Sequence, residues 1–379
     1  MEANVIDQIR FGKYKNIYCP DQLIAGKEGS AHNYCRGHYT IGKEIADLCL
    51  DKIRKQAEKC NNLEGFLITN SMGGGTGSGL CCLLMERISC DYGKKFKANF
   101  SIFPSPKISP IIVEPYNTLL CLHSFNDHSD ISVIFDNEAL YNMCSNLLNI
   151  EKPSYYNLNS VISQVISSLT VSIRFFGSIN NDLMQFCTNL IPYPRIHYLT
   201  TSLNPIMPAE KAFHEEISTY QITNKCFDPS TMMVNIDPSN GRYMSCCLMY
   251  RGDVHPNEIC PCTSNIKSNK LIKFVDWCPT GFKCGINPKI PACIHESQIA
   301  QAIRSLCMIS NSTAISEIFA KQCYKFDRMY AKRAFTHSFV GEGMESGEFS
   351  EAIEDASSLI CDYKEIQTNT LLGLGQLKL

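Results

Sequence analysis

A run of glycines and hydroxyl residues, Gly73-Gly-Gly-Thr-Gly-Ser-Gly79, is the segment whose composition points most directly to chemistry. A short apolar stretch, Gly65 to Ile68, precedes it, and Leu80 to Ile88 is helical in pattern. Glycines at a strand-to-helix junction let backbone N–H groups converge on an anion, and the helix N-terminus adds a favourable dipole. The run lacks the lysine of a P-loop and the spacing of the dinucleotide fingerprint. The sequence therefore predicts a phosphate-binding loop of another type, with a plain glycine-rich turn as the competing interpretation.

The residues on either side of this loop alternate between helical and strand patterns. The predicted elements are a helix from Thr40 to Cys60, strands at Phe100–Phe103 and Ile131–Phe135, helices near Thr118 and after Asn137, and a long helix over 157–169. Such alternation indicates a parallel sheet with helices on both faces. The apolar face of the long helix favours a connecting role between two domains.

The second half of the chain has a different pattern. Strands are predicted at Tyr243–Tyr250 and Ile272–Trp277, helices return from Thr313, and Gln367–Leu379 is predicted to be a frayed, non-acidic tail. The predicted domains are an incomplete nucleotide-binding domain (1–155), a connecting helix (156–174), an intermediate mixed α/β domain (175–312), a C-terminal helical hairpin (313–366) and the tail (367–379).

Composition excludes some classes of partner. Lys and Arg total 35 against 37 Asp and Glu, so the chain presents no basic field for nucleic acid and no patch for anionic lipid. The sequence has no apolar stretch long enough for a transmembrane helix and no apolar signal core near Met1, so we expect a cytoplasmic protein without a membrane partner.

The glycine-rich loop resembles the signature of the tubulins, the GTP-binding proteins of microtubules, and the likeness extends over nearly the whole chain. The other segments that resemble tubulin are Ala31–Glu44, Glu86-Arg87, Asp91–Lys95, Val113–Asn117, Pro192–His197, Phe274–Lys283 and Met329–Phe335. Several of these, with the stretch from Pro288 to Ile299, are similar to the α rather than the β subunit. The resemblance implies a three-layer, parallel-sheet GTP-binding domain, a mixed α/β second domain and C-terminal helices.

The resemblance also implies a site for GTP and Mg²⁺. By position, the phosphate-binding residues are Ser71, Gly73, Gly74, Gly75, Thr76 and Gly77, the guanine-binding residues are Asn137 and Asn159, the stacking residue is Tyr155, and the Mg²⁺ ligand is Glu2. An asparagine can both donate to and accept from a purine edge, and an aromatic face can stack on a base. Without the resemblance, Asn137 and Asn159 would be interpreted as a helix cap and a surface residue.

Four positions depart from the family pattern. Gly29 and His32 stand where the α subunit usually has an aspartate and an asparagine, which removes a carboxylate on the magnesium side. Pro110 replaces a threonine near the sugar and cannot donate a backbone hydrogen bond. Gln185 replaces the glutamate that the α subunit offers to the GTP of the neighbouring β subunit, and an amide cannot act as a general base.

Both ends of the sequence also differ from the family. The chain begins where the family has already passed two strand–helix units, so we expect a truncated α-tubulin-like chain whose GTP-binding domain lacks its first units. The ending Leu371–Leu379 has no acidic tail. We expect a cytoskeletal, structural subunit that pairs with β-tubulin in a heterodimer and polymer. The alternatives are a non-polymerising binder of β-tubulin or tubulin chaperones, a stand-alone GTPase, and a non-functional truncated product.

Overall fold

The computed structural model describes residues 1–105, 109, 111–177, 179, 182–212, 217–268, 272–278, 281–293 and 298–376. The chain folds into two compact units, unit 1 (Met1–Asp130 and Phe319–Ser358) and unit 2 (Ile131–Ile318 and Leu359–Leu379). These units are defined by contacts and do not correspond to the five predicted domains. The predicted boundaries therefore stay predictions.

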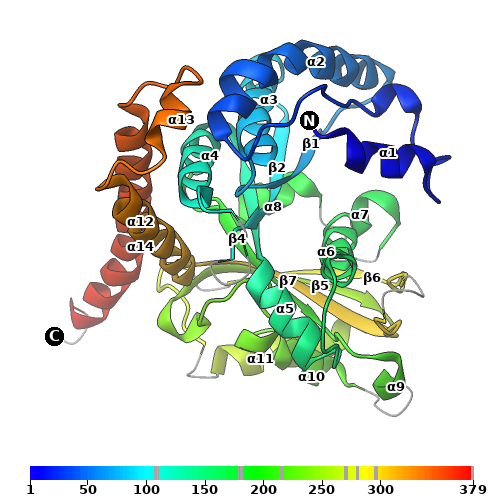
Figure 1. Cartoon of the computed structure of the whole chain (residues 1–379). Helices are drawn as coiled ribbons and strands as arrows, with labels where there is room; N and C mark the ends of the chain where they lie inside the picture. The colour runs from blue at the N-terminus through cyan, green and yellow to red at the C-terminus, as the bar shows by residue number, and fades with distance from the viewer. Residues whose placement is uncertain are drawn as a thin grey trace. The chain divides into compact units, whose positions relative to one another are not determined.

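Unit 1 contains the glycine-rich loop and the helices that surround it (Figure 1). Its elements are α1 (Ala3–Phe11), η1 (Pro20–Gln22), η2 (Arg36–Thr40), α2 (Ile41–Lys59), β1 (Gly65–Ser71), η3 (Thr76–Leu80), α3 (Cys81–Asp91), β2 (Phe96–Phe103), α4 (Glu114–His128), most of α12 (Ser316–Tyr330), α13 (Thr336–Val340) and the start of α14 (Glu348–Gln376). The turns η2 and η3 are single π-helical turns, a conformation that is frequent at functional sites.

The core of unit 1 combines a parallel strand pair with an aromatic cluster. Strands β1 and β2 pair in parallel from Gly65↔Phe96 to Ser71↔Ile102. Tyr116 on α4 is fully buried, and its ring meets Phe326 edge to face at 5.1 Å and Phe339 at 5.6 Å. Aromatic pairs of this geometry stabilise a core beyond their buried area. This cluster fixes α4 against α12 and α13, and α4 in turn carries residues of the candidate site.

Unit 2 holds the remaining strands and the long central helix (Figure 1). Its elements are β3 (Ile131–Asp136), α5 (Asn137–Asn146), α6 (Tyr155–Leu169), α7 (Val171–Arg174), α8 (Leu183–Leu190), β4 (Tyr198–Asn204), α9 (Ala209–Ala212), α10 (Thr219–Lys225), η4 (Pro229–Thr231), η5 (Pro238–Asn240), β5 (Tyr243–Gly252), α11 (Pro256–Ser268), β6 (Phe282–Asn287), β7 (Arg304–Ser312) and η7 (Thr313–Ile315). Its strands follow the spatial order β3-β4-β7-β5-β6.

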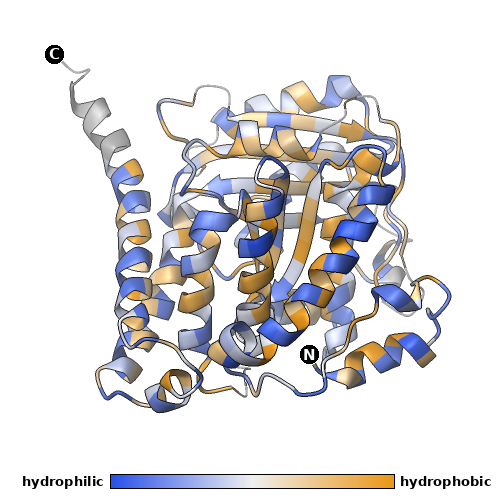
Figure 2. Ribbon diagram, turned by 90° about the horizontal axis from the view of Figure 1, so that it is seen from above, coloured by the Kyte–Doolittle hydropathy of each residue, from blue (hydrophilic) through white to orange (hydrophobic). Residues whose placement is uncertain are grey.

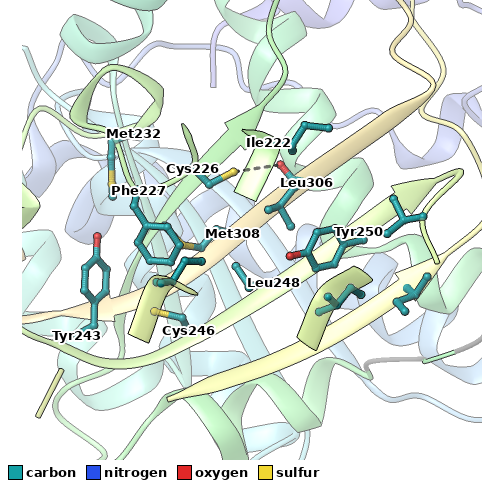
Figure 3. Close-up of a cluster of buried hydrophobic side chains, with 14 residues drawn as sticks. Ile222, Cys226, Phe227, Met232, Tyr243, Cys246, Leu248, Tyr250, Leu306 and Met308 are labelled. Carbon is teal, nitrogen blue, oxygen red and sulfur yellow. Dashed lines mark hydrogen bonds between the residues drawn. The ribbon is translucent and has the colours of Figure 1, made fainter. Parts of the chain in front are cut away.

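The sheet of unit 2 is mixed. Pairs β3–β4 and β5–β6 are parallel, whereas β7 is antiparallel to both β4 and β5. Every residue of β5 is buried, and Leu248 and Tyr250 on this strand pack with Ile222 and Phe227 in one hydrophobic cluster (Figure 3). In the same cluster the Cys226 thiol lies 3.8 Å from the carbonyl oxygen of Leu306. A strand buried on both faces reads as a continuous apolar run, which is why the sequence predicted β5.

The α/β fold class predicted from the sequence is confirmed, as are the strands that became β2, β3 and β5. The long helix predicted over 157–169 is present as α6, followed by the short α7 after Thr170, and its connecting role stays a prediction. The helices carry both hydrophilic and hydrophobic residues, as their amphipathic patterns require (Figure 2). Among the described residues, no helix has both the length and the apolar content needed to cross a membrane.

Two predicted elements are wrong. Residues Ile272–Trp277 form no strand, and Phe274 makes a single parallel bridge to Tyr243, because β6 occupies the edge of β5 from Cys246 onward. The segment 367–379 is not a frayed tail over most of its length, since α14 continues to Gln376. Buried Tyr363 anchors this part of the helix, and propagation from an anchored turn costs little.

Candidate functional site

The glycine-rich loop of unit 1 begins where β1 ends at Ser71 and runs into η3 and α3. Asn70 holds the end of the loop at Gly77. Its side-chain amide donates to the Gly77 carbonyl oxygen (2.9 Å), and its side-chain oxygen accepts from the Ser101 hydroxyl on β2 (2.7 Å). The loop folds back so closely that a Cβ at Gly77 would lie 2.2 Å from the Ser71 carbonyl oxygen. The strand-loop-helix geometry predicted from the sequence is therefore present.

A second segment, residues 30–37, packs directly against this loop. A Cβ at Gly75 would lie 2.5 Å from the carbonyl oxygen of Asn33, and one at Gly79 would lie 2.1 Å from that of Tyr34. Conversely, a Cβ at Gly37 would lie 2.2 Å from the Gly75 carbonyl oxygen. Only glycine fits at such backbone-to-backbone contacts. The glycines thus serve the packing of two loops as well as the exposure of N–H groups.

Asn117 on α4 joins the two segments. Its side-chain amide donates to the carbonyl oxygens of His32 (2.7 Å) and Gly73 (2.9 Å), and its oxygen accepts from the backbone N–H of Tyr34 (3.0 Å). Asn117 is fully buried. A buried amide with this many partners holds a specific geometry, because losing any one of them leaves a polar group unsatisfied.

The loop is open at one position. A Cβ at Gly74 would meet no atom within 4 Å, in contrast to the crowded glycines on either side. The Thr76 hydroxyl lies beside the loop and is 3.0 Å from the hydroxyl of Ser30. The glycine backbone, the start of the helix and the hydroxyl groups of Ser30 and Thr76 all lie on the two segments that meet here, and N–H and hydroxyl groups are the donors that a phosphate group requires. These residues fit the phosphates of a nucleotide.

A carboxyl group on α4 lies next to the loop. The Oε1 atom of Glu114 would be 2.9 Å from a Cβ at Gly73, and the same oxygen accepts a hydrogen bond from the Ser109 hydroxyl. Burial raises the pKa of Glu114, an effect that Ser109, Lys325 and His32 partly oppose. Glu114 can accept hydrogen bonds from a polar ligand beside Gly73.

The predicted Mg²⁺ ligand, Glu2, lies close to the segment 30–37. A Cβ at Gly29 would be 3.6 Å from its Cγ and 3.8 Å from its Oε1. Glu2 is therefore next to Gly29, the position at which the resemblance implies an aspartate. Among the described residues, no group of three or more His, Cys, Asp or Glu side chains could hold a metal. The donors present suit Mg²⁺ only if phosphate oxygens and water complete its coordination.

The residues predicted to bind the base lie in unit 2, on helices α5 and α6. Asp136 is the N-cap of α5, where it accepts from the N–H of Glu138 (2.9 Å), so the interpretation of Asn137 as the cap is wrong. Tyr155 and Asn159 are spaced four residues apart on α6 and both are exposed. This spacing places them on one face of the helix. Their contact with a base is untested and stays a prediction.

Gln185 lies on α8 of unit 2 in a short polar chain. The Lys283 ammonium donates to its Oε1 (2.6 Å), and its own amide donates to Asp182 (3.3 Å). The amide is therefore oriented on both sides. The catalytic role of this position stays a prediction. Pro110 lies outside the described residues.

In unit 1, Ser71 and Gly73–Gly77 lie together with the segment 30–37, and Gly29, which precedes this segment, lies beside Glu2. The sequence prediction did not include Ser30, Glu114 or Asn117. Glu114 and Asn117 stand within the Val113–Asn117 segment already noted for its resemblance, and an Asn close to the apolar run Leu119–Leu122 was the available signal. Ser30 had no signal, because a serine in a loop is ordinary.

Two family models match the chain. The GTPase domain of the Tubulin/FtsZ family matches residues 1–145, and the tubulin C-terminal domain matches residues 194–324. The first match contains the glycine-rich loop, the segment 30–37 and α4. Its GTPase description implies guanine-nucleotide binding, in agreement with the phosphate-binding geometry.

Proposed function

Because this chain belongs to the tubulin family, we propose that it is an α-tubulin-like structural subunit, which binds GTP with Mg²⁺ and pairs with β-tubulin in a microtubule-type polymer. The cytoplasmic cytoskeleton is its proposed location. Resemblance to the α subunit in several of the tubulin-like segments, together with Pro288–Ile299, supports the α assignment.

The observation that carries the GTP proposal is the packing of residues 30–37 against the glycine-rich loop. This packing leaves the Cβ side of Gly74 open, and it brings the hydroxyl groups of Ser30 and Thr76 to 3.0 Å from each other. A preformed anion site needs little ordering when the ligand binds, so little binding free energy is lost to ordering the loop. When bound, Mg²⁺ would neutralise phosphate charge, and Glu2 would hold it from the protein side.

Isothermal titration of the full chain with GTP and with ATP, both with Mg²⁺, tests the proposal. We expect selective binding of GTP, with lower affinity than an α subunit that has the aspartate at position 29. Asn159→Ala should weaken GTP binding and reduce the preference over ATP, because its amide would read the guanine edge. Asn189→Ala is the matched control, since Asn189 is also an exposed helical asparagine of unit 2. Equal affinity for GTP and ATP would contradict the assignment.

Pairing with β-tubulin is tested by sedimentation with β-tubulin and GTP. Entry of the chain into pelleted polymer supports the subunit role. A second candidate function is a binder that forms a soluble complex with β-tubulin or with tubulin chaperones. The amide at Gln185 favours this candidate, because a chain that does not enter filaments needs no general base at this position. A soluble complex without polymer would support it.

A further inference from the structure

We propose that the hydroxyl of Ser30 is a phosphate-binding group of this chain, acting together with the hydroxyl of Thr76 in the glycine-rich loop. This inference rests on the proposed binding of GTP and assigns one further residue to the phosphate side of that site. It concerns unit 1 alone, where the two segments meet.

Ser30 reaches the loop from a distant part of the sequence. Its Oγ lies 3.0 Å from the Oγ1 of Thr76, although 46 positions separate the two residues. The side chain is almost buried, with 6% of its surface exposed. The Ser30 carbonyl oxygen accepts a hydrogen bond from the backbone N–H of Asn33 (2.9 Å), which fixes the turn that carries the hydroxyl. Ser30 is therefore held in place on both its backbone and its side chain.

The surroundings of this pair are rigid. Gly75, next to Thr76, is in backbone contact with Asn33, and Asn117 ties the His32 carbonyl to that of Gly73. Neither segment can move away without breaking buried hydrogen bonds. Two hydroxyl groups that are already positioned lose little conformational freedom when a ligand binds.

The chemistry of the pair suits a phosphate. Each hydroxyl has one donor, and between Ser30 and Thr76 only one of the two donors is used. A phosphate oxygen is an acceptor alone: it takes the free donor of the pair, or both donors where it replaces the Ser30–Thr76 hydrogen bond, and hydrogen bonds to a charged acceptor are about twice as strong as neutral ones. The open space beside Gly74 lies in the same loop.

The residue before Ser30 explains why a hydroxyl matters in this chain. Gly29 has no carboxylate, and the carboxylate that lies beside it is that of Glu2. A serine hydroxyl binds phosphate directly and repels none of its charge. We therefore expect the contribution of Ser30 to persist when Mg²⁺ is removed.

The test compares four full-length proteins: the unchanged chain, Ser30→Ala, Ser30→Thr and Ser89→Ala. Ser89 on α3 is a matched control, because its hydroxyl donates to the carbonyl oxygen of His128 (3.4 Å) at the end of α4 in the same unit. Affinities for GTP and guanosine are measured by competition with a fluorescent guanine nucleotide, with Mg²⁺ and with EDTA, and the unfolding temperature is measured without nucleotide.

We expect Ser30→Ala to weaken GTP binding by on the order of 10- to 100-fold with or without Mg²⁺, and to leave guanosine binding unchanged. Ser30→Thr should retain most of the affinity, and Ser89→Ala all of it. If the unchanged chain binds GTP and Ser30→Ala binds it equally well, this inference fails and the proposed function stands. Equal losses for GTP and guanosine would show a structural role only. If the unchanged chain binds no guanine nucleotide, the proposed function fails and this inference fails with it.

Discussion

The packing of residues 30–37 on the glycine-rich loop makes Gly75→Ala a sharp test of the site. The added Cβ would lie 2.5 Å from the Asn33 carbonyl oxygen and 2.6 Å from the Asn33 nitrogen. Restoring an ordinary 3.4 Å contact requires a shift of roughly 0.9 Å (3.4 − 2.5) in one of the two backbones. No side-chain rotation can relieve this clash, because the opposing atoms belong to the main chain.

The expected energy follows from two opposing effects. Gly75 has φ −72° and ψ −34°, a conformation that alanine adopts freely, so restricting the unfolded chain would stabilise the variant by about 0.4–1 kcal/mol. Overpacking of a tight contact costs about 1–3 kcal/mol, and more where backbone must move. The clash outweighs the entropic gain. We expect Gly75→Ala to lower the free energy of unfolding by about 1–2 kcal/mol without nucleotide.

Gly74→Ala is the matched control, one residue away in the same loop. Its Cβ would meet no atom within 4 Å and its φ is not positive, so the unfolding free energy should stay the same or rise slightly. The same methyl group enters the open side of the loop, so GTP affinity should fall. Urea denaturation of the nucleotide-free chains, followed by titration with GTP, separates the two effects. Equal stability of Gly75→Ala and Gly74→Ala would refute the proposed packing.

Three further outcomes are expected. Gly29→Asp places a second carboxyl beside Glu2, so GTP affinity should become more dependent on Mg²⁺. The measurement is the ratio of the GTP affinity with Mg²⁺ to the GTP affinity with EDTA. A ratio equal to that of the unchanged chain would show that the two carboxyl groups do not share an ion. Burial raises the pKa of Glu114, so the native state holds the proton of Glu114 more tightly, and the contribution of this group to stability falls as pH rises from about 4 through the raised pKa. Glu114→Gln should therefore flatten the dependence of the unfolding free energy on pH, measured by urea denaturation between about pH 4 and 7. The same dependence in both proteins would contradict the assignment. Gln185→Glu would give Lys283 a carboxylate partner and would place a general base at this position. The rate of phosphate release in filaments with β-tubulin should then rise by about 10²- to 10⁴-fold. Equal rates for the variant and the unchanged chain would remove this position from the mechanism.

The sequence by itself determined the local features of this protein. The glycine-rich loop lies between a strand and a helix because glycine permits the turn and the apolar runs on each side have the matching periods. Strands β3 and β5 followed from largely apolar runs and β2 from the apolar residues Phe100, Ile102 and Phe103, and such patterns need no information about neighbouring strands. The resemblance to tubulin, carried by short motifs, agrees with the two family matches.

Tertiary structure alone decided how these pieces combine. Residues 272–277 have a strand-like pattern, but β6 pairs with the edge of β5 in their place. A sequence pattern cannot show which of these two segments pairs with β5. The contacts of Ser30 and Asn117 join segments more than 40 positions apart, as the 46 positions between Ser30 and Thr76 illustrate. Sequence periodicity describes one element at a time. Which glycines face a neighbouring backbone, and which one faces open space, is fixed only when the two loops meet.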